Sequence, residues 1–215
     1  MPRTTARSAP ASRRRQARSE ASRERIVAAV IECVERGGFA AATSQAIARE
    51  AGLSVGAVQH HFPSKEDVLD AVLEESAARF AACFDSVPAP TLPLVERVDD
   101  FVDRAWRHYG SPFFRAAQEI VLGARRREAD AAGGPAPAVL ASARVAEQVW
   151  REQFGHLSLS RAAHRDLRRH AFASLTGLAL LARFEPDVRR LDRPIAHLKT
   201  GLRASIEAAQ VPGVG

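Results

Sequence analysis

Two adjacent histidines, His60 and His61, are the residues of this sequence that most directly suggest chemistry. Imidazole is a general base and a common metal ligand. Successive side chains on a helix point about 100 degrees apart, so this pair is poorly placed to share one ion, and no acidic residue or cysteine follows on the same predicted helix. The other histidines have no ligand spacing: His108, His156, His164, His170 and His197. We therefore predict no metal site.

Catalysis is not predicted either. The sequence lacks the Gly-x-Ser-x-Gly elbow of hydrolases, a phosphate-binding loop and a dinucleotide fingerprint. The paired acids Asp99 and Asp100 belong to a helical pattern and are expected to face solvent. Cys33 and Cys83 are too few for a disulfide framework and are expected to be buried apolar side chains. We predict no catalytic residue, no cofactor and no enzyme; an all-helical enzyme whose site only the fold assembles stays open as an alternative.

The charge of the chain is concentrated at its N-terminus. The first 25 residues contain eight arginines and two glutamates, so they carry the whole net charge of +6 and the remainder is neutral. A cationic arm on a neutral body favours a polyanionic partner, either nucleic acid or an acidic membrane surface. Residues 1–21 have almost no bulky apolar side chains and are expected to be a disordered basic arm; a merely solubilising tail is the alternative.

The composition otherwise fits a folded protein of the cytoplasm. Hydrophobic residues make up 46% of the 215 residues, and charged residues make up 26%. No apolar run reaches the roughly 18 residues of a membrane span, and the arginine-rich start lacks the apolar stretch of a secretory signal. Two cysteines fit a reducing compartment. We predict a cytoplasmic protein with no membrane partner.

Apolar residues recur every three to four positions after residue 21, alanine is abundant, and β-branched alternation is absent. These patterns predict an all-α fold. Ser22 is expected to cap the first helix, and prolines between residues 88 and 93 predict a loop. The expected helices lie at 22–36, in two short pieces between Thr43 and Phe62, and at 64–84, 93–109, 112–128, 136–154, 160–184 and 194–209.

The stretch Thr43–Leu69, TSQAIAREAGLSVGAVQHHFPSKEDVL, has the pattern of two short helices joined by a tight turn. Thr43 or Ser44 can cap the first helix, Gly52 supplies a left-handed residue that ends it, and Ser54 can cap the second. Val58 and Phe62 lie four residues apart on one face of the second helix. Two helices that meet at a three-residue turn containing glycine are typical of a helix-turn-helix motif.

The outward face of the second short helix has the chemistry of a DNA-reading surface. Gly56 and Ala57 are small and allow a close approach of the backbone, while Gln59 presents a donor and an acceptor together, which suits a base edge. The free amides at the helix N-terminus can bind phosphate. This geometry fits the major groove of double-stranded DNA.

The segment TSQAIAREAGLSVGAVQHHFPSKEDVLDAVLEE resembles the DNA-binding segment of the TetR family of bacterial transcriptional regulators. The resemblance covers residues about 22–75, with caps, glycine, apolar positions and the HFPSKEDVL ending in register. It implies an all-helical homodimer whose C-terminal body binds a small ligand and which represses when unliganded. The residues expected to bind DNA are Thr43, Ser44, Ser54, Val55, Gly56, Ala57, Gln59, His60, His61 and Lys65.

Two positions depart from the common family pattern. A lysine often follows the cap of the recognition helix, where this chain has Val55, and a tyrosine often precedes the His-Phe element, where it has Gln59 and His60. Both usual residues contact the DNA backbone. Val55 can instead touch a thymine methyl, and the arginine arm can supply electrostatics along the backbone or in the minor groove.

The C-terminal half suggests a dimer and a ligand site. Helix 170–184 has apolar or small residues on nearly every side, and Ile195, Leu198, Leu202 and Ile206 form a stripe at near-heptad spacing. A four-helix interface between two subunits is expected, with a fully internal helix of a monomer as the alternative. Aromatic residues that could surround an apolar ligand cavity are Phe101, Trp106, Tyr109, Phe113, Phe114, Trp150 and Phe154.

Together these expectations describe three segments and one function. Residues 1–21 form the arm, 22–69 the helix-turn-helix DNA-binding domain, and 70–215 a helical domain for ligand binding and dimerisation. The predicted function is a sequence-specific transcriptional regulator, a repressor released from a near-palindromic operator by a small apolar or amphipathic effector. The alternative is a ligand-independent helix-turn-helix protein that binds nucleic acid or a partner.

Overall fold

The structure, a computed structural model, describes residues 9–86, 91–128, 137–185 and 187–210, without the side chains of residues 9–12, 65, 124–128, 137, 138 and 188. The described chain contains only helices, so the all-α prediction is confirmed. Its elements are α1 (Ala9–Gly37), η1 (Phe39–Ala41), α2 (Ser44–Ala51), α3 (Val55–His61), α4 (Lys65–Ala82), α5 (Leu94–Tyr109), α6 (Pro112–Glu128), α7 (Pro137–Phe154), α8 (Arg161–Leu181), η2 (Val188–Leu191) and α9 (Asp192–Ala209).

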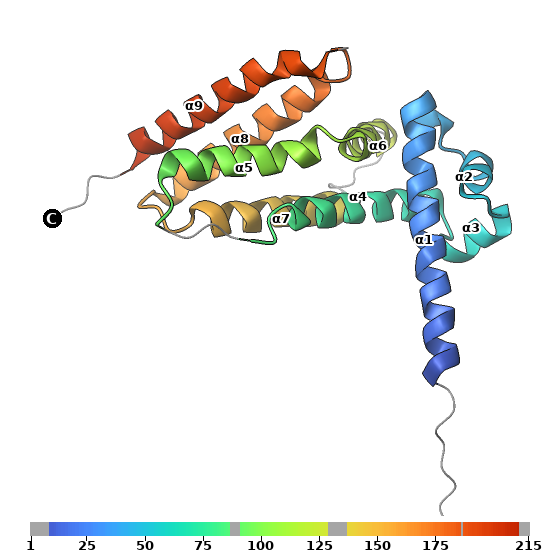
Figure 1. The fold of residues 1–215 in the computed structure, drawn as a ribbon. Helices are drawn as coiled ribbons and strands as arrows, with labels where there is room; N and C mark the ends of the chain where they lie inside the picture. Colours follow the sequence, from blue (N-terminus) through green and yellow to red (C-terminus); the bar gives the residue numbers. More distant parts are fainter. Residues whose placement is uncertain (1–8, 87–90, 129–136, 186, 211–215) are drawn as a thin grey trace, which may run out of the picture.

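The chain forms a small head and a longer body (Figure 1). Helix α1 crosses one end of the body, and α2 and α3 lie on the side of α1 that faces away from it. Helix α4 runs from the head into the body, where it packs against α7. Helix α6 packs against α1, and α8 and α9 pack against each other and against α5. No described helix is long and apolar enough to cross a membrane.

Two hydrophobic cores share α4. Val72 at its middle belongs to the head core, together with the buried face of α1, whereas Phe80 and Phe84 near its end belong to the body core. Helix α6 adds Phe113 and Ile120 to the head core, although it follows α5 of the body. The head is therefore held to the body by two helices, because the apolar residues of both α4 and α6 are buried against α1.

The prediction that residues 1–21 are disordered is wrong for residues 9–21, which form the first turns of α1. Ser22 is not a helix cap, since it lies inside α1 and its hydroxyl donates to Arg18 O at 2.9 Å. Residues 13–21 are exposed, so no packing holds them. Alanine, arginine, glutamine and glutamate are good helix formers, and they extend a helix already nucleated by the buried stretch from Ile26 to Val34. Residues 1–8 lie outside the described part of the chain.

The expected dimer stripe of the last helix is also corrected. Ile195, Leu198, Leu202 and Ile206 are buried in the core of their own chain, with at most 8% of each exposed. Near-heptad spacing indicates an apolar face but not which partner covers it, and here α5 and α8 cover it. Ala171 and Ala179 of α8 are likewise fully buried, whereas Gly177 is exposed.

Candidate functional site

The turn between α2 and α3 has the geometry that its sequence predicts. The Thr43 hydroxyl accepts a hydrogen bond from Ala46 N at 3.2 Å, and the Ser54 hydroxyl accepts one from Ala57 N at 3.1 Å. Gly52 adopts φ 62° and ψ 39°, a left-handed backbone conformation that residues other than glycine rarely adopt. Leu53 N donates to Ala48 O at 2.9 Å. These bonds fix the angle at which α3 leaves α2.

Helix α3 is buried along one narrow face. Val58 and Phe62, its C-cap, are each 3% exposed and pack in the head core with Ile47. Val55, Gly56, Gln59 and His60 are exposed, and Ala57 and His61 are half-buried. A short helix that is anchored on one side and free on the other can enter a groove as a rod.

Gly56 is one of the exposed residues of this free face. A Cβ added there would meet no atom within 4 Å, so the fold does not require glycine at this position. Its absent side chain instead leaves backbone open to an approaching surface. His60 and His61 contact each other edge to face, with ring centroids 5.6 Å apart. In the described part of the chain, no group of three or more His, Cys, Asp or Glu residues is arranged to hold a metal ion.

Thr43 and Ser44 lie at the exposed N-terminus of α2. Lys65 begins α4, but its side chain lies outside the described part of the structure. The predicted DNA-binding residues thus gather at α3 and at the N-termini of α2 and α4. Sequence reasoning missed two further exposed side chains, Gln45 and Arg49, which α2 presents to solvent.

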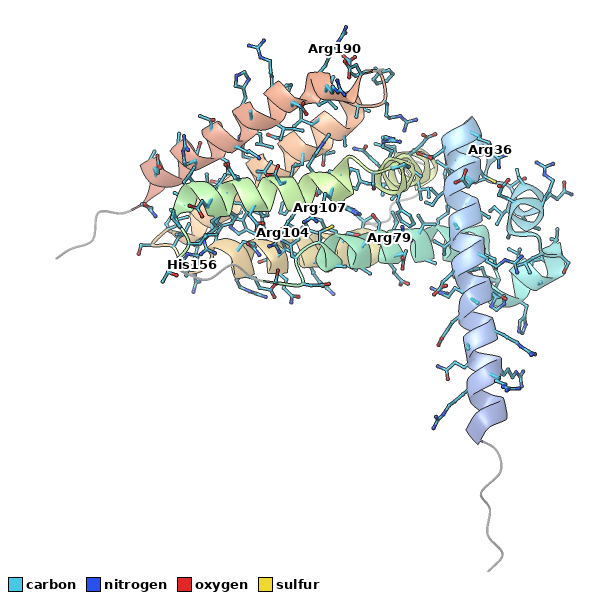
Figure 2. All side chains as sticks on the ribbon, viewed as in Figure 1. Arg36, Arg79, Arg104, Arg107, His156 and Arg190 are labelled. Atoms are coloured by element: carbon cyan, nitrogen blue, oxygen red, sulfur yellow. The ribbon has the colours of Figure 1, made fainter. Side chains whose placement is uncertain are left out.

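Sequence reasoning also missed the arginines of α1 that hold the motif in place. Arg25 Nη2 donates to Ala51 O and, at 3.4 Å, to Gly52 O, so its guanidinium stabilises the carbonyls that α2 leaves free at its C-terminus. Arg36, near the other end of α1 (Figure 2), pairs with Glu50 of α2. The guanidinium of Arg23 lies 4.8 Å from the centroid of the Phe62 ring. The signal in the sequence was the spacing of eleven residues between Arg25 and Arg36, which is close to three full helical turns.

A second candidate site is a cavity of about 180 Å³, partly open to solvent, that lies between the head core and the body core. Residues from five helices line it: Leu73, Ser76, Ala77 and Phe80 of α4, His108 and Tyr109 of α5, Phe114, Ala117, Gln118 and Val121 of α6, Ser142 and Ala146 of α7, and Thr176 of α8. Aromatic and aliphatic walls with a few hydroxyl and amide groups are typical of ligand pockets.

The seven aromatic residues that were expected to surround one cavity do not gather around one space. Tyr109 and Phe114 line the cavity, with ring centroids 4.2 Å apart. The rings of Phe101, Trp150 and Phe154 pack against one another and fill the body core instead. Trp106 packs at the edge of that core, and Phe113 belongs to the head core under the Arg79 guanidinium. Aromatic residues fill space as readily as they line it, so their presence alone did not locate the cavity.

His108 is one of two titratable groups in the cavity wall, with Tyr109, and is 5% exposed. Its Nε2 lies 3.3 Å from the Ser76 hydroxyl. Burial, and then the nearby Arg79 guanidinium, lower the pKa of His108 to about 4. Burial raises the pKa of the Tyr109 phenol well above its usual range. At neutral pH the cavity is therefore lined by uncharged groups that can donate and accept hydrogen bonds.

A wider open groove of about 850 Å³ lies where α1 crosses α4 and the start of α6. Glutamates and arginines of α1, α4 and α5 line it, and Figure 2 marks Arg79 and Arg107 at its body side. The predicted solvent-facing acids lie elsewhere and are half-buried; Asp100 pairs with Arg104 at 2.7 Å. Cys33 is buried as expected, whereas Cys83 is only half-buried at the groove.

A capped helix, a glycine turn and a second short helix with one free face define a helix-turn-helix DNA-binding head. Residues 26–72 match the family described as bacterial regulatory proteins, tetR family. The HTH-type transcriptional regulator SrpR of Pseudomonas putida is 44% identical over 61 residues, which are 28% of this chain and 29% of the relative. That alignment covers less than a third of the relative's length.

Solved structures extend the likeness to the whole fold. The multidrug binding protein EbrR, complexed with imidazole, has a TM-score of 0.61 at 23% identity and covers 89% of this chain and 97% of its own. TylP, a TetR regulator from Streptomyces fradiae, has a TM-score of 0.61 at 22% identity and covers 91% of this chain and 89% of its own. Residues 26–72 therefore form a helix-turn-helix head that matches the tetR family of bacterial regulatory proteins, and the chain as a whole shares the fold of these solved structures.

The Gly56→Ala variant distinguishes an effect on folding from an effect on DNA binding. Alanine has room at this helical position and should raise the free energy of unfolding by up to about 1 kcal/mol. The added methyl group holds α3 away from bases, so DNA affinity should fall by about tenfold, or ~1.4 kcal/mol. Urea denaturation and fluorescence anisotropy measure the two effects. Unchanged affinity would show that the backbone at Gly56 does not approach DNA.

The lowered pKa of His108 predicts a loss of stability in mild acid. His108 binds a proton near pH 6.5 in the unfolded chain, but only near pH 4 in the folded chain. The free energy of unfolding should therefore fall as the pH drops from 6.5 toward 4, by up to about 1.4 kcal/mol per pH unit.

In the His108→Gln variant, this contribution to the slope of the free energy of unfolding against pH should disappear. Urea denaturation at pH 7.5, 6 and 5 measures it in both proteins. His156, whose pKa is also lowered, is common to both and cancels in the comparison. Equal slopes in the two proteins would contradict the burial of an uncharged His108.

Proposed function

We propose that this chain is a transcriptional repressor that binds a near-palindromic operator as a homodimer and is released by a small, largely apolar effector. The observation that carries the proposal is α3, a short helix whose outer face is exposed while Val58 and Phe62 anchor its inner face. Such a helix fits the major groove, where Gln59 can pair with an adenine edge and Val55 can contact a thymine methyl.

The need for two recognition helices supports a dimer. One helix of seven residues reaches few base pairs, whereas two related by a two-fold axis read half-sites about 34–36 Å apart or a multiple of that spacing. Helix α8 ends in an exposed apolar surface in which Leu180, Leu181 and Phe184 are 45%, 56% and 78% exposed. Exposed apolar groups of this size favour burial against a partner.

Small residues extend this surface along both helices. Ala173 and Gly177 of α8 are exposed, as are Ala196, Gly201 and Ala204 of α9. A Cβ added at Gly177 or Gly201 would meet nothing within 4 Å in the single chain. Small side chains let helices approach closely, so these outer faces of α8 and α9 are the proposed dimer interface. The inner stripe beginning at Ile195 has no part in it.

The effector is proposed to occupy the 180 Å³ cavity, because two of the helices that line this cavity also pack into the head core. One side of α6 lines the cavity with Phe114 and Gln118, and its other side packs Phe113 and Ile120 into the head core. Helix α4 makes the same double contact. A molecule that moves either helix therefore shifts the head, and a shift from 1:99 to 99:1 takes about 5.5 kcal/mol of differential binding.

A second junction lies at Glu119 of α6. One of its carboxylate oxygens accepts from Phe39 N at 2.9 Å, and the other pairs with Arg183 at 2.7 Å. Gly123, one turn later, contacts the Phe39 ring so closely that an added Cβ would lie 2.5 Å from it. Displacement of α6 would break these contacts, and loss of the Glu119 bonds would uncouple the head from the end of α8.

The lining also limits the effector's chemistry. A cavity of this size is slightly larger than the ~150 Å³ that holds benzene in an engineered protein. His108 is uncharged at neutral pH, and Arg79 lies nearby, so a neutral aromatic or aliphatic molecule with one hydrogen-bonding group fits best. EbrR, which shares the fold, is described in complexes with imidazole and with malachite green.

Genome-wide selection of bound DNA fragments tests the proposal as a whole. We expect enrichment of a two-fold symmetric site, with affinity that depends on both sequence and salt. Salt-dependent binding without sequence selectivity would overturn the proposal. It would favour a ligand-independent protein that binds nucleic acid through the arginine-rich N-terminal part of α1.

Gly177→Lys should break the dimer while the chain still folds. The single chain has room for a lysine at this exposed position, but a charge would lie inside the proposed interface. Sedimentation should show monomers, and operator affinity should fall by tenfold or more. Leu122→Lys, at an exposed position of α6, is the control and should stay dimeric. Dimers of the Gly177→Lys variant would contradict the proposed interface.

Ala146→Leu should abolish the response to an effector. The larger side chain fills part of the cavity from the α7 side, so operator binding should persist while effectors found by screening on the wild type no longer release DNA. Ala143→Leu, at an exposed position of the same helix, should respond normally. Equal release from both variants would place the effector elsewhere.

A further inference from the structure

Helix α1 distributes its charges unevenly over its faces. Arg25 and Arg36 lie on the face that contacts α2, as their bonds to Ala51 O and Glu50 show. Glu20 and Glu24 instead line the groove toward α4 and the body, together with Arg23, which pairs with Glu74 of α4. The helix thus presents arginine to the helix-turn-helix side and mainly glutamate to the body side.

The arginine face continues beyond the head. Arg18 precedes Arg25 by seven residues and Arg14 precedes it by eleven, so at 100 degrees per residue both fall within about 20 degrees of Arg25. Both are exposed. At 1.5 Å per residue they lie about 10 and 16 Å along the axis from Arg25. In Figure 1 this part of α1 extends past α3, away from the body.

We infer that Arg14 and Arg18 form a rigid phosphate clamp that binds the DNA backbone beside the half-site read by α3. This inference rests on the proposed DNA-binding function and names the surface that extends it. Duplex DNA carries one negative charge per roughly 1.7 Å of axis, so two arginines whose positions are about 6 Å apart along the helix axis can each meet a separate phosphate. Arginine suits this contact because its planar fork donates two hydrogen bonds at once.

The helix, rather than a loose tail, is essential to the inference. Because α1 is one continuous helix, its buried half between Ile26 and Val34 sets the direction of its exposed half. Arg25, bound to the turn before α3, links the two regions. The clamp therefore keeps a fixed position relative to the recognition helix, and it supplies charge that Val55 does not.

The test compares two double variants of equal charge in the full chain. Arg14→Gln with Arg18→Gln removes the clamp, whereas Arg13→Gln with Arg15→Gln removes two arginines that point about 80 to 120 degrees away from Arg25. All four positions are exposed, so neither variant should unfold. The probe is the DNA fragment selected with the wild-type protein, titrated over a range of salt concentrations.

The clamp variant should lose about tenfold in affinity, and the slope of log K against log salt should fall by roughly 1.8, about 0.9 per lost phosphate contact. The control should lose less than half of that slope. Equal losses in both variants, or none in either, would overturn the inference. If the wild type itself binds no selected sequence, the proposed function fails first, which is a separate result.

Ala17→Pro tests the rigidity. Proline breaks the helix between the two arginines without removing a charge, and the head should stay folded because residues 13–21 are exposed. Affinity should fall toward that of the clamp variant. Wild-type affinity would show that a flexible basic tail is sufficient and would overturn the rigid clamp.

Discussion

The account depends on how few side chains hold α3 in place. Val58 and Phe62 are buried against α1 and α2, and the rest of this short helix is left to solvent or half covered. Burial of a large apolar side chain contributes about 1.5–3 kcal/mol, so two such anchors can hold this helix of seven residues on the head. The turn at Gly52 then sets its direction, with its carbonyl and that of Ala51 bound by Arg25.

Helix α1 connects this arrangement to the rest of the molecule. One face of it is the base of the head core, a second bonds to α2 through arginines, and a third closes a groove against α4 and α6. Helices α4 and α6 pack against α1 and also line the cavity. The cavity is therefore bounded by residues of both cores, with Leu73 and Ala117 from the head core and Phe80 and Tyr109 from the body core.

The local structure of the head could be predicted from the sequence, because helix caps, a glycine turn and apolar spacing depend only on residues close together in the chain. Thr43, Gly52 and Ser54 have the roles that their residue types predict. The errors arose where the outcome depends on distant partners. Ile195 and Leu202 form an apolar stripe whose spacing could not tell an internal partner from a second subunit. Phe101 and Phe113 could not be assigned to a cavity or a core until the helices were in place. The helix at residues 9–21 was missed because a region without apolar residues was expected to be disordered, although it continues a helix nucleated elsewhere.

The central claim, that α3 lies in the major groove, is tested most directly by dimethyl sulfate interference on the selected DNA fragment. Methylation at guanine N7 blocks the major groove, and methylation at adenine N3 blocks the minor groove. The account predicts interference at guanine N7 in two symmetric clusters about 34–36 Å apart or at a multiple of that spacing. Interference at adenine N3 alone, or binding indifferent to both, would contradict it.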